Sequence, residues 1–138
     1  RRRRGSCRTR RSGGRGRRRR AIRFGELVTI FEEQARGLVL GGADLLMIET
    51  AQDILEVKAA IFGAREAFKA TGRAVPIQCS VSLLPNGGKM LLGTDIDAVL
   101  TTLEALKVDA IGLNCSTGPE DMRDAIRYQM RDDDQVSP

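Results

Sequence analysis

The sequence predicts an α/β fold of about three parallel strands with their helices, and two patterns support that class. In residues 22–130, four stretches with apolar residues at helical spacing alternate with three short apolar runs of strand length. Strict alternation of this kind specifies a parallel sheet with right-handed crossovers. No glycine-rich dinucleotide loop follows any expected strand, which modestly favours an arc of a barrel over an open doubly wound sheet.

The first half of this region contains two expected helices and one strand. The first helix ends at Gly41-Gly42. Residues 44–48 (DLLMI) form an apolar run, as expected for a strand that is covered on both faces. Thr50 and Asp53 form a capping-box pair before the second helix. The apolar stripe of that helix consists of Ile54, Val57, Ile61, Ala64 and Phe68.

The second half contains two more strands and two more helices. The strands are expected at residues 75–83 and 109–113. Thr94 is the expected cap of the helix between them, and Thr117 is the expected cap of the last helix. The apolar pattern ends after Tyr128, so we expect residues 131–138 to be disordered. One partial domain at 22–130 is the resulting prediction.

Charge divides the chain into two unlike parts. Residues 1–23 contain thirteen Arg and no acid, whereas the rest of the chain is acidic. Residues 1–21 offer no apolar face to bury, and we expect a disordered tail there. An arginine arm that grips nucleic-acid phosphates is one interpretation, and its binding would be sequence-blind and salt-dependent. The other interpretation, which composition favours, is a segment translated from GC-rich DNA in the wrong frame.

Cysteine usage argues against a disulfide framework. The three cysteines, Cys7, Cys79 and Cys115, are an odd number at wide spacing, and the sequence contains no histidine. A zinc site of four protein ligands therefore cannot be assembled from this chain. No apolar run is long enough for a membrane span, and the basic start is not followed by an export signal. We expect a soluble, cytoplasmic protein with no membrane partner.

Polar residues follow the expected strands at the edge where parallel sheets bind ligands. Glu49 ends the first strand, and its carboxylate is either a ligand for a substrate ammonium or a helix N-terminal acid favoured by the dipole. Ser80 and Ser82 lie near the end of the second strand. Asn114 and Cys115 follow the third strand, where a thiolate would be stabilised by the next helix N-terminus.

An isolated cysteine beside a strand is more often a small buried hydrophobic residue than a ligand. That interpretation applies to Cys79, which lies in mid-strand, and it stays open for Cys115 on spacing alone.

Several blocks of sequence, in the same order and at similar spacing, resemble the homocysteine-binding (homocysteine S-methyltransferase) domain of cobalamin-dependent methionine synthases. The similarity runs from about Ile22 to Tyr128. The blocks are GGADLLMIET at 41–50, VPIQ at 75–78, MLLGT at 90–94 and IGLNCSTGP at 111–119.

This resemblance implies a (β/α)8 TIM barrel of which the chain supplies roughly strands four to six. It makes Cys115 one of three cysteine ligands of a catalytic zinc, and the other two, an adjacent pair near strand eight, are not in this sequence. It assigns Glu49 to the amino group of homocysteine and places Asn114 with it in the substrate site. The first three strands are replaced by the arginine-rich tail, so the chain alone is expected to be an inactive fragment.

The chemistry implied by the resemblance is methyl transfer to homocysteine to form methionine. Zinc would deprotonate the homocysteine thiol, and the methyl donor in the full-length relatives would be methylcobalamin. The expected partners are homocysteine and the cobalamin and folate domains of those relatives. The alternatives are a nucleic-acid-binding protein that acts through its tail and a nonfunctional truncated fragment.

Overall fold

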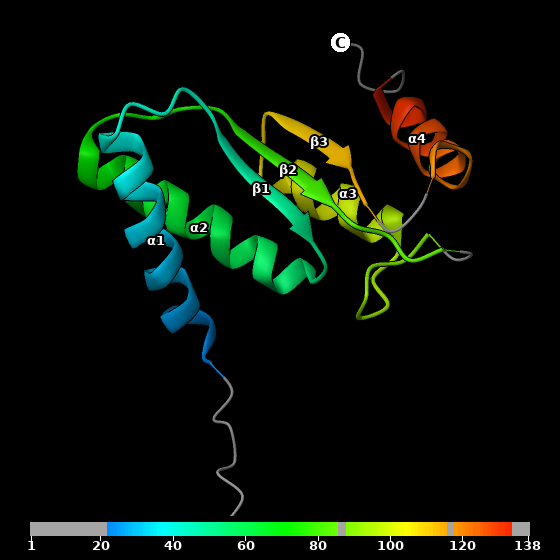
Figure 1. Ribbon diagram of the computed structural model, residues 1–138, viewed down its shortest axis with the longest axis horizontal. Coiled ribbons are helices and arrows are strands. Elements are labelled where there is room, and N and C mark those ends of the chain that lie inside the picture. Colours follow the sequence, from blue (N-terminus) through cyan, green and yellow to red (C-terminus); the bar gives the residue numbers. More distant parts are fainter. Residues whose placement is uncertain (1–21, 86–87, 116–117, 134–138) are drawn as a thin grey trace, which may run out of the picture.

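Three parallel strands form one sheet in sequence order, β1-β2-β3 (Figure 1). The computed structural model describes residues 22–85, 88–115 and 118–133. The strands are β1 (Leu46–Ala51), β2 (Ile77–Val81) and β3 (Ala110–Leu113). The predicted α/β class and its parallel order are confirmed. The strand bounds differ from those expected: β1 ends three residues later than 48, and β2 is shorter than 75–83 at both ends.

One face of the sheet is packed against helices. On the central strand Ile77, Cys79 and Val81 are buried, and their side chains belong to one hydrophobic cluster with Val57 and Leu103 of the flanking helices. In Figure 1 helix α3 (Ile96–Ala105) lies behind β2 and β3. Because successive side chains of a strand point to opposite faces, the residues between these buried positions lie on the opposite, open face.

Strand β1 shows the same alternation of buried and exposed side chains at its start. Leu46 is buried, whereas Met47 and Glu49 are exposed. The backbone N–H of Leu46 donates to the carbonyl of Pro76 on the β2 side (2.9 Å). In a parallel strand the peptide groups of alternate residues point to opposite sides, so that of Met47 points to the free edge. The helices that carry Val57 and Leu103 cover the face formed by Ile77, Cys79 and Val81, in agreement with the expectation of helices on one face.

Helices α1 (Phe24–Leu40) and α2 (Ile54–Thr71) pack closely through Gly63. A Cβ atom at Gly63 would lie 2.7 Å from the backbone nitrogen of Glu32 and 2.7 Å from Cβ of Phe31. Real Cβ atoms do not make contacts that short, so glycine is needed for this helix separation. The surrounding buried face of α2 consists of small or medium residues, Val57, Ala59, Ala60, Ile61, Ala64 and Ala67.

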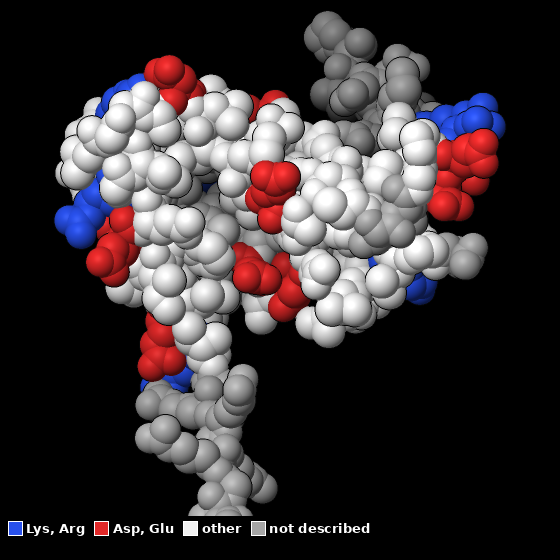
Figure 2. All heavy atoms as spheres, viewed as in Figure 1, with Lys and Arg blue, Asp and Glu red and all other residues white. Residues whose placement is uncertain are grey.

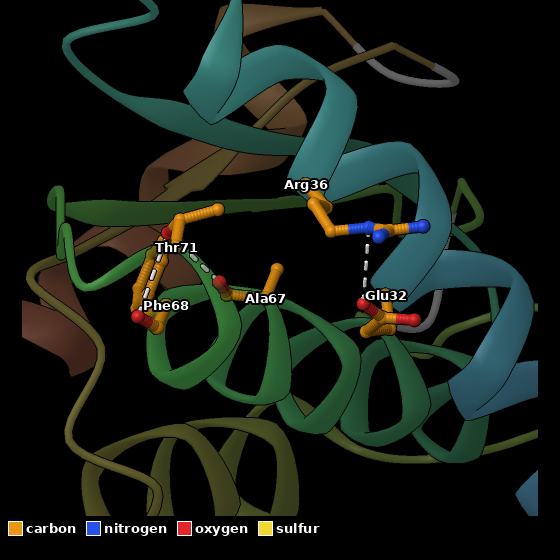
Figure 3. A network of polar contacts seen from close by, with 5 residues as sticks. All are labelled: Glu32, Arg36, Ala67, Phe68 and Thr71. Atoms are coloured by element: carbon orange, nitrogen blue, oxygen red, sulfur yellow. Dashed lines mark hydrogen bonds and ion pairs between the residues drawn. The ribbon is translucent and has the colours of Figure 1, made fainter.

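The ends of α2 have clear side-chain and backbone causes. Asp53 is the N-cap, and its carboxylate accepts a hydrogen bond from the N–H of Leu55 (2.9 Å). Gly72 adopts the left-handed conformation (φ 68°) that ends the helix. In the last turn the hydroxyl of Thr71 donates to the carbonyls of Ala67 and Phe68 (Figure 3).

Two predicted caps were wrong. Thr50 does not cap α2, because its hydroxyl accepts a hydrogen bond from Asn114 instead. Thr94 does not cap α3, because it lies within a tight turn in which its carbonyl accepts from the N–H of Met90 (2.8 Å). Asp95 takes the N-cap position of α3, and its carboxylate pairs with Lys89 (2.9 Å) rather than with the helix backbone.

The last helix, α4, spans Pro119–Asp133. Residues 131–133, expected to be disordered, therefore continue a helix. Charged residues dominate that stretch, and the apolar spacing used to predict the helix is absent from it. The expected Thr117 cap, the arginine-rich tail and residues 134–138 lie outside the described residues. Within the described residues, the helices are too short or too polar to cross a membrane.

Polar contacts fix the connections at the amino-terminal ends of the strands. Arg73 donates to the carbonyl of Val39 (3.0 Å) and pairs with Asp44 (3.1 Å). Asp109 accepts a hydrogen bond from the N–H of Ile77 (2.8 Å). These contacts of Arg73 and Asp109 lie at the end of the sheet where the strands begin. A separate ion pair between Glu32 and Arg36 (3.4 Å) lies along α1 above α2 (Figure 3).

We expect Gly63→Ala to lower the free energy of unfolding by about 1–3 kcal/mol, the usual cost of forcing an extra group into a packed interface. The measurement is urea unfolding of the full chain. Gly37→Ala is the matched control, because a Cβ at this helical glycine meets nothing within 4 Å. That variant should gain up to about 1 kcal/mol from helix propensity. Stabilisation by both substitutions would contradict the close approach at Gly63.

Candidate functional site

The polar residues predicted at the strand ends gather at the carboxyl-terminal end of the sheet. Met47 pairs with Gln78 and Ile48 with Cys79, and Glu49 follows directly on Ile48. Ser80 alternates with the buried Cys79 and Val81 and therefore points to the open face. Beyond Ile48 the pairing shifts, and Ala51 pairs with Val81. This bulge turns the end of β1 next to Glu49.

Asn114 connects the carboxyl ends of all three strands. Its side-chain Oδ1 accepts a hydrogen bond from the hydroxyl of Ser80, which lies in β2 (2.7 Å). Its Nδ2 donates to Oγ1 of Thr50 in β1 (2.7 Å) and to Sγ of Cys115 (3.1 Å). Both amide N–H groups are thus used within the protein, and one lone pair of Oδ1 stays available.

Two residues in this network have an unusual backbone. Thr50 (φ 56°) and Cys115 (φ 57°) both adopt the left-handed conformation. That conformation is uncommon for any residue except glycine and is strained for a β-branched side chain. Such strain persists only where surrounding contacts hold it, and the Asn114 amide contacts both residues. No local pattern indicated this role for Thr50, because its spacing from Asp53 matched a capping box.

The two cysteines described by the structure have opposite environments. Cys79 is fully buried on the helix side of β2, as predicted, and burial raises the pKa of its thiol to about 11. Cys115 is exposed beyond the end of β3. Of these two thiols, only that of Cys115 is open to solvent and to an incoming ligand.

The described residues do not form a complete metal site. Over residues 22–85, 88–115 and 118–133, no group of three or more His, Cys, Asp or Glu side chains is placed to hold an ion. Cys115 fits the requirement for one zinc ligand, since its sulfur is exposed and oriented by a neighbouring amide. Further ligands would have to come from outside the described residues.

Glu49 also borders a groove of about 260 Å³ along the free edge of β1. The groove lies between α1, which contributes Phe31, Ala35 and Leu38, and the start of α2. Thr50 lines this groove, whereas Asn114 and Cys115 do not. The structure therefore connects Asn114 and Cys115 to Thr50 by hydrogen bonds, and Glu49 joins this group as the chain neighbour of Thr50.

The two remaining predicted residues, Ser80 and Ser82, are buried and form hydrogen bonds with residues at the ends of the neighbouring strands. Ser82 is buried just after β2, and its N–H donates to the carbonyl of Ala51 (2.9 Å). Ser80 is buried in β2, and its hydroxyl donates to Oδ1 of Asn114. Figure 2 shows acidic side chains in the middle of the viewed face and basic ones nearer its margins, in keeping with the acidic body expected from the sequence.

Comparison with known proteins identifies the family to which this chain is similar. A family model described as homocysteine S-methyltransferase matches residues 5–137. Methionine synthase of Mycobacterium tuberculosis (strain ATCC 25618 / H37Rv) is 46% identical over 101 residues, which cover 73% of this chain and 8% of that protein. Methionine synthase of Mycobacterium leprae (strain TN) is 45% identical over 98 residues, covering 71% and 8%. The chain spans less than a tenth of the length of these relatives.

We expect alkylation to distinguish the two thiols. In the native chain near neutral pH, iodoacetamide should modify Cys115 and leave Cys79 intact. The raised pKa alone reduces the thiolate fraction of Cys79 by about a hundredfold relative to an ordinary thiol, and burial blocks access further. Mass spectrometry of the separate peptides measures both rates. Equal rates in the native chain, without added denaturant, would contradict this placement of Cys79.

Proposed function

Since the chain belongs to the homocysteine S-methyltransferase family, we propose that it carries part of the substrate site of a methyltransferase that converts homocysteine to methionine. The observation that carries this proposal is the convergence of Asn114, Cys115 and the Glu49–Thr50 pair at one end of a parallel sheet. Ligands of parallel α/β folds bind at that end. The activity of the whole protein is part of the proposal, because the chain covers only a small share of its relatives.

Each residue has a proposed role that follows from its chemistry. Glu49 is exposed near the end of β1, and its carboxylate would bind the substrate ammonium. Asn114 retains one lone pair on Oδ1, which can accept a hydrogen bond from the same ammonium. The sulfur of Cys115 would bind the metal that holds the substrate sulfur. The amine and the sulfur of homocysteine are only a few bonds apart, so these three groups must lie near one another.

Zinc is the proposed metal, with Cys115 as one of three cysteine ligands and the other two supplied from outside this sequence. When bound in such a site, zinc would favour the deprotonated form of the homocysteine thiol and so make its sulfur nucleophilic. The protein groups of this chain would orient the substrate. Glu49 would fix the amino end, while Asn114 would hold the Cys115 side chain through its amide.

Apolar exposure supports a larger assembly around this module. Met47 on the open face is 47% exposed, and Leu92 in the loop after β2 is 70% exposed. Exposed apolar surface of this kind is typical of a packing interface. We propose that further strands of a (β/α)8 barrel cover the open face, and that the methyl donor is methylcobalamin, held with folate by other domains of a full-length protein.

The nucleic-acid alternative gains no support from the described residues, because the arginine-rich tail lies outside them. The family match begins at residue 5 and so includes much of that tail. Salt-dependent binding by the tail stays a prediction. A cytoplasmic location also stays a prediction, as does the inactivity of this chain by itself.

The first test is a chimera in which residues 22–127 replace the matching segment of the M. tuberculosis methionine synthase. We expect the chimera to bind zinc and to methylate homocysteine. Cys115→Ser should remove zinc and lower activity by more than the roughly 10–100-fold that loss of an outer-shell partner costs. Zinc content and methionine formation are the measurements.

Cys79→Ala is the matched control for that substitution, since Cys79 is buried on the helix side of the sheet and remote from the open face. The chimera with Cys79→Ala should keep stoichiometric zinc even if its fold loses some stability. Full zinc and full activity in the Cys115→Ser chimera would show that Cys115 is not a ligand.

The second test concerns Glu49 in the same chimera. We expect Glu49→Gln to raise the KM for homocysteine about tenfold or more, because a hydrogen bond between charged groups contributes roughly 1.5–3 kcal/mol where water is excluded. Zinc content should not change. An unchanged KM, or a loss of zinc without a change in KM, would remove Glu49 from the substrate site.

A further inference from the structure

The hydrogen bond between Asn114 and Thr50 joins the two halves of the candidate site. Thr50 is the chain neighbour of Glu49, and Asn114 is the chain neighbour of Cys115. The strands that carry them, β1 and β3, are separated by β2 and share no ladder hydrogen bonds. The 2.7 Å contact between Nδ2 of Asn114 and Oγ1 of Thr50 therefore connects these strands directly, across 64 residues of sequence.

The same nitrogen atom fixes the position of the sulfur. Nδ2 of Asn114 also donates to Sγ of Cys115 at 3.1 Å. Because both bonds end on one atom, the Cys115 sulfur cannot lie farther from Oγ1 of Thr50 than the sum of the two contacts. A third bond, from Ser80 to Oδ1 (2.7 Å), sets the orientation of the amide plane. One planar group thus holds the sulfur at a defined distance from the end of β1.

The two residues that the Asn114 amide contacts both have a strained backbone, so these contacts hold conformations that are otherwise unfavourable. Thr50 and Cys115 have φ angles of 56° and 57°. A glycine or asparagine would adopt this conformation at lower cost. The network therefore keeps two unfavourable conformations at the points where the chain leaves Glu49 and enters Cys115.

We propose that Thr50 and Asn114 form a spacer that sets the separation between the Glu49 carboxylate and the Cys115 sulfur, and thereby selects the length of the amino thiol. This inference rests on the proposed function, in which those two groups bind the two ends of homocysteine. Thr50 and Asn114 are then positioning residues. The selected substrate is the thiol with two methylene groups between the sulfur and the amino-acid carbon, and cysteine, with one methylene group fewer, is too short.

The test uses the full chain without metal and Cys115 as its own tether. The chain is equilibrated with an equal mixture of homocystine and cystine. The Cys115 thiolate attacks one sulfur of either disulfide, a mixed disulfide forms, and homocysteine or cysteine leaves with the electron pair and takes up a proton. Mass spectrometry of the Cys115 peptide gives the ratio of the two adducts, and the ratio in denaturant gives the intrinsic preference.

We expect the native chain to favour the homocysteine adduct by about two- to fivefold over the denatured chain, since an exposed ion pair contributes only modestly. Thr50→Val removes the acceptor and should return the ratio to the denatured value. Thr50→Ser keeps a hydroxyl at the same place and should retain the preference. Asn114→Ala is the second disrupting variant, and protection of Cys79 from alkylation verifies the fold of each.

The outcomes separate the spacer from the proposed function. If Glu49→Gln loses the preference while Thr50→Val and Asn114→Ala keep it, the spacer is refuted and the Glu49 assignment stands. A native ratio equal to the denatured one also overturns the spacer, and the zinc content and activity of the chimera then judge the proposed function independently. Loss of preference in both disrupting variants, with retention in Thr50→Ser, supports the spacer.

Discussion

Burial of one face of the three-stranded sheet against its helices is the constraint on which the rest of the structure depends. Ile77, Cys79 and Val81 of the central strand are fully or nearly fully buried in that layer. Alternation along β2 then directs Ser80 to the opposite face, and the register with β1 places Met47 beside Gln78 on that same face. A slip of one residue would reverse these positions. The packing of an apolar layer thus determines where the polar groups of the site can meet.

Sequence patterns predicted the elements and their order because those features depend on local and repetitive properties. Three apolar runs and the helical spacing between them are visible without any tertiary contact. The placement of Cys79 in the core followed from its apolar neighbours in the strand. The homocysteine methyltransferase family was predicted from several blocks in register, which are far more specific than any single residue.

Other features could not be predicted because they depend on contacts between distant segments. Local spacing predicted that the Thr50 hydroxyl caps α2. Instead, this hydroxyl accepts a hydrogen bond from the side-chain amide of Asn114, 64 residues away. Thr94 does not cap α3, because it lies in a turn that starts at Met90. The left-handed backbone at Thr50 and Cys115 has no composition signal, since neither residue type favours it. The residue types of the candidate site are thus a prediction from sequence, whereas its hydrogen-bond geometry needed the structure.

Strand order along the sheet has a consequence for how this chain reaches its structure. Each strand pairs only with the next strand in sequence, and α1 packs on α2, the next helix along the chain. Each of these pairings must close a loop that contains a whole helix, so parallel pairing is slower than the formation of contacts within one helix. A chain emerging from the ribosome can pack β1 with α1 and α2 before β3 has been synthesised. Asn114, which follows β3, can donate to Thr50 only when β1 and β3 are both in place on either side of β2.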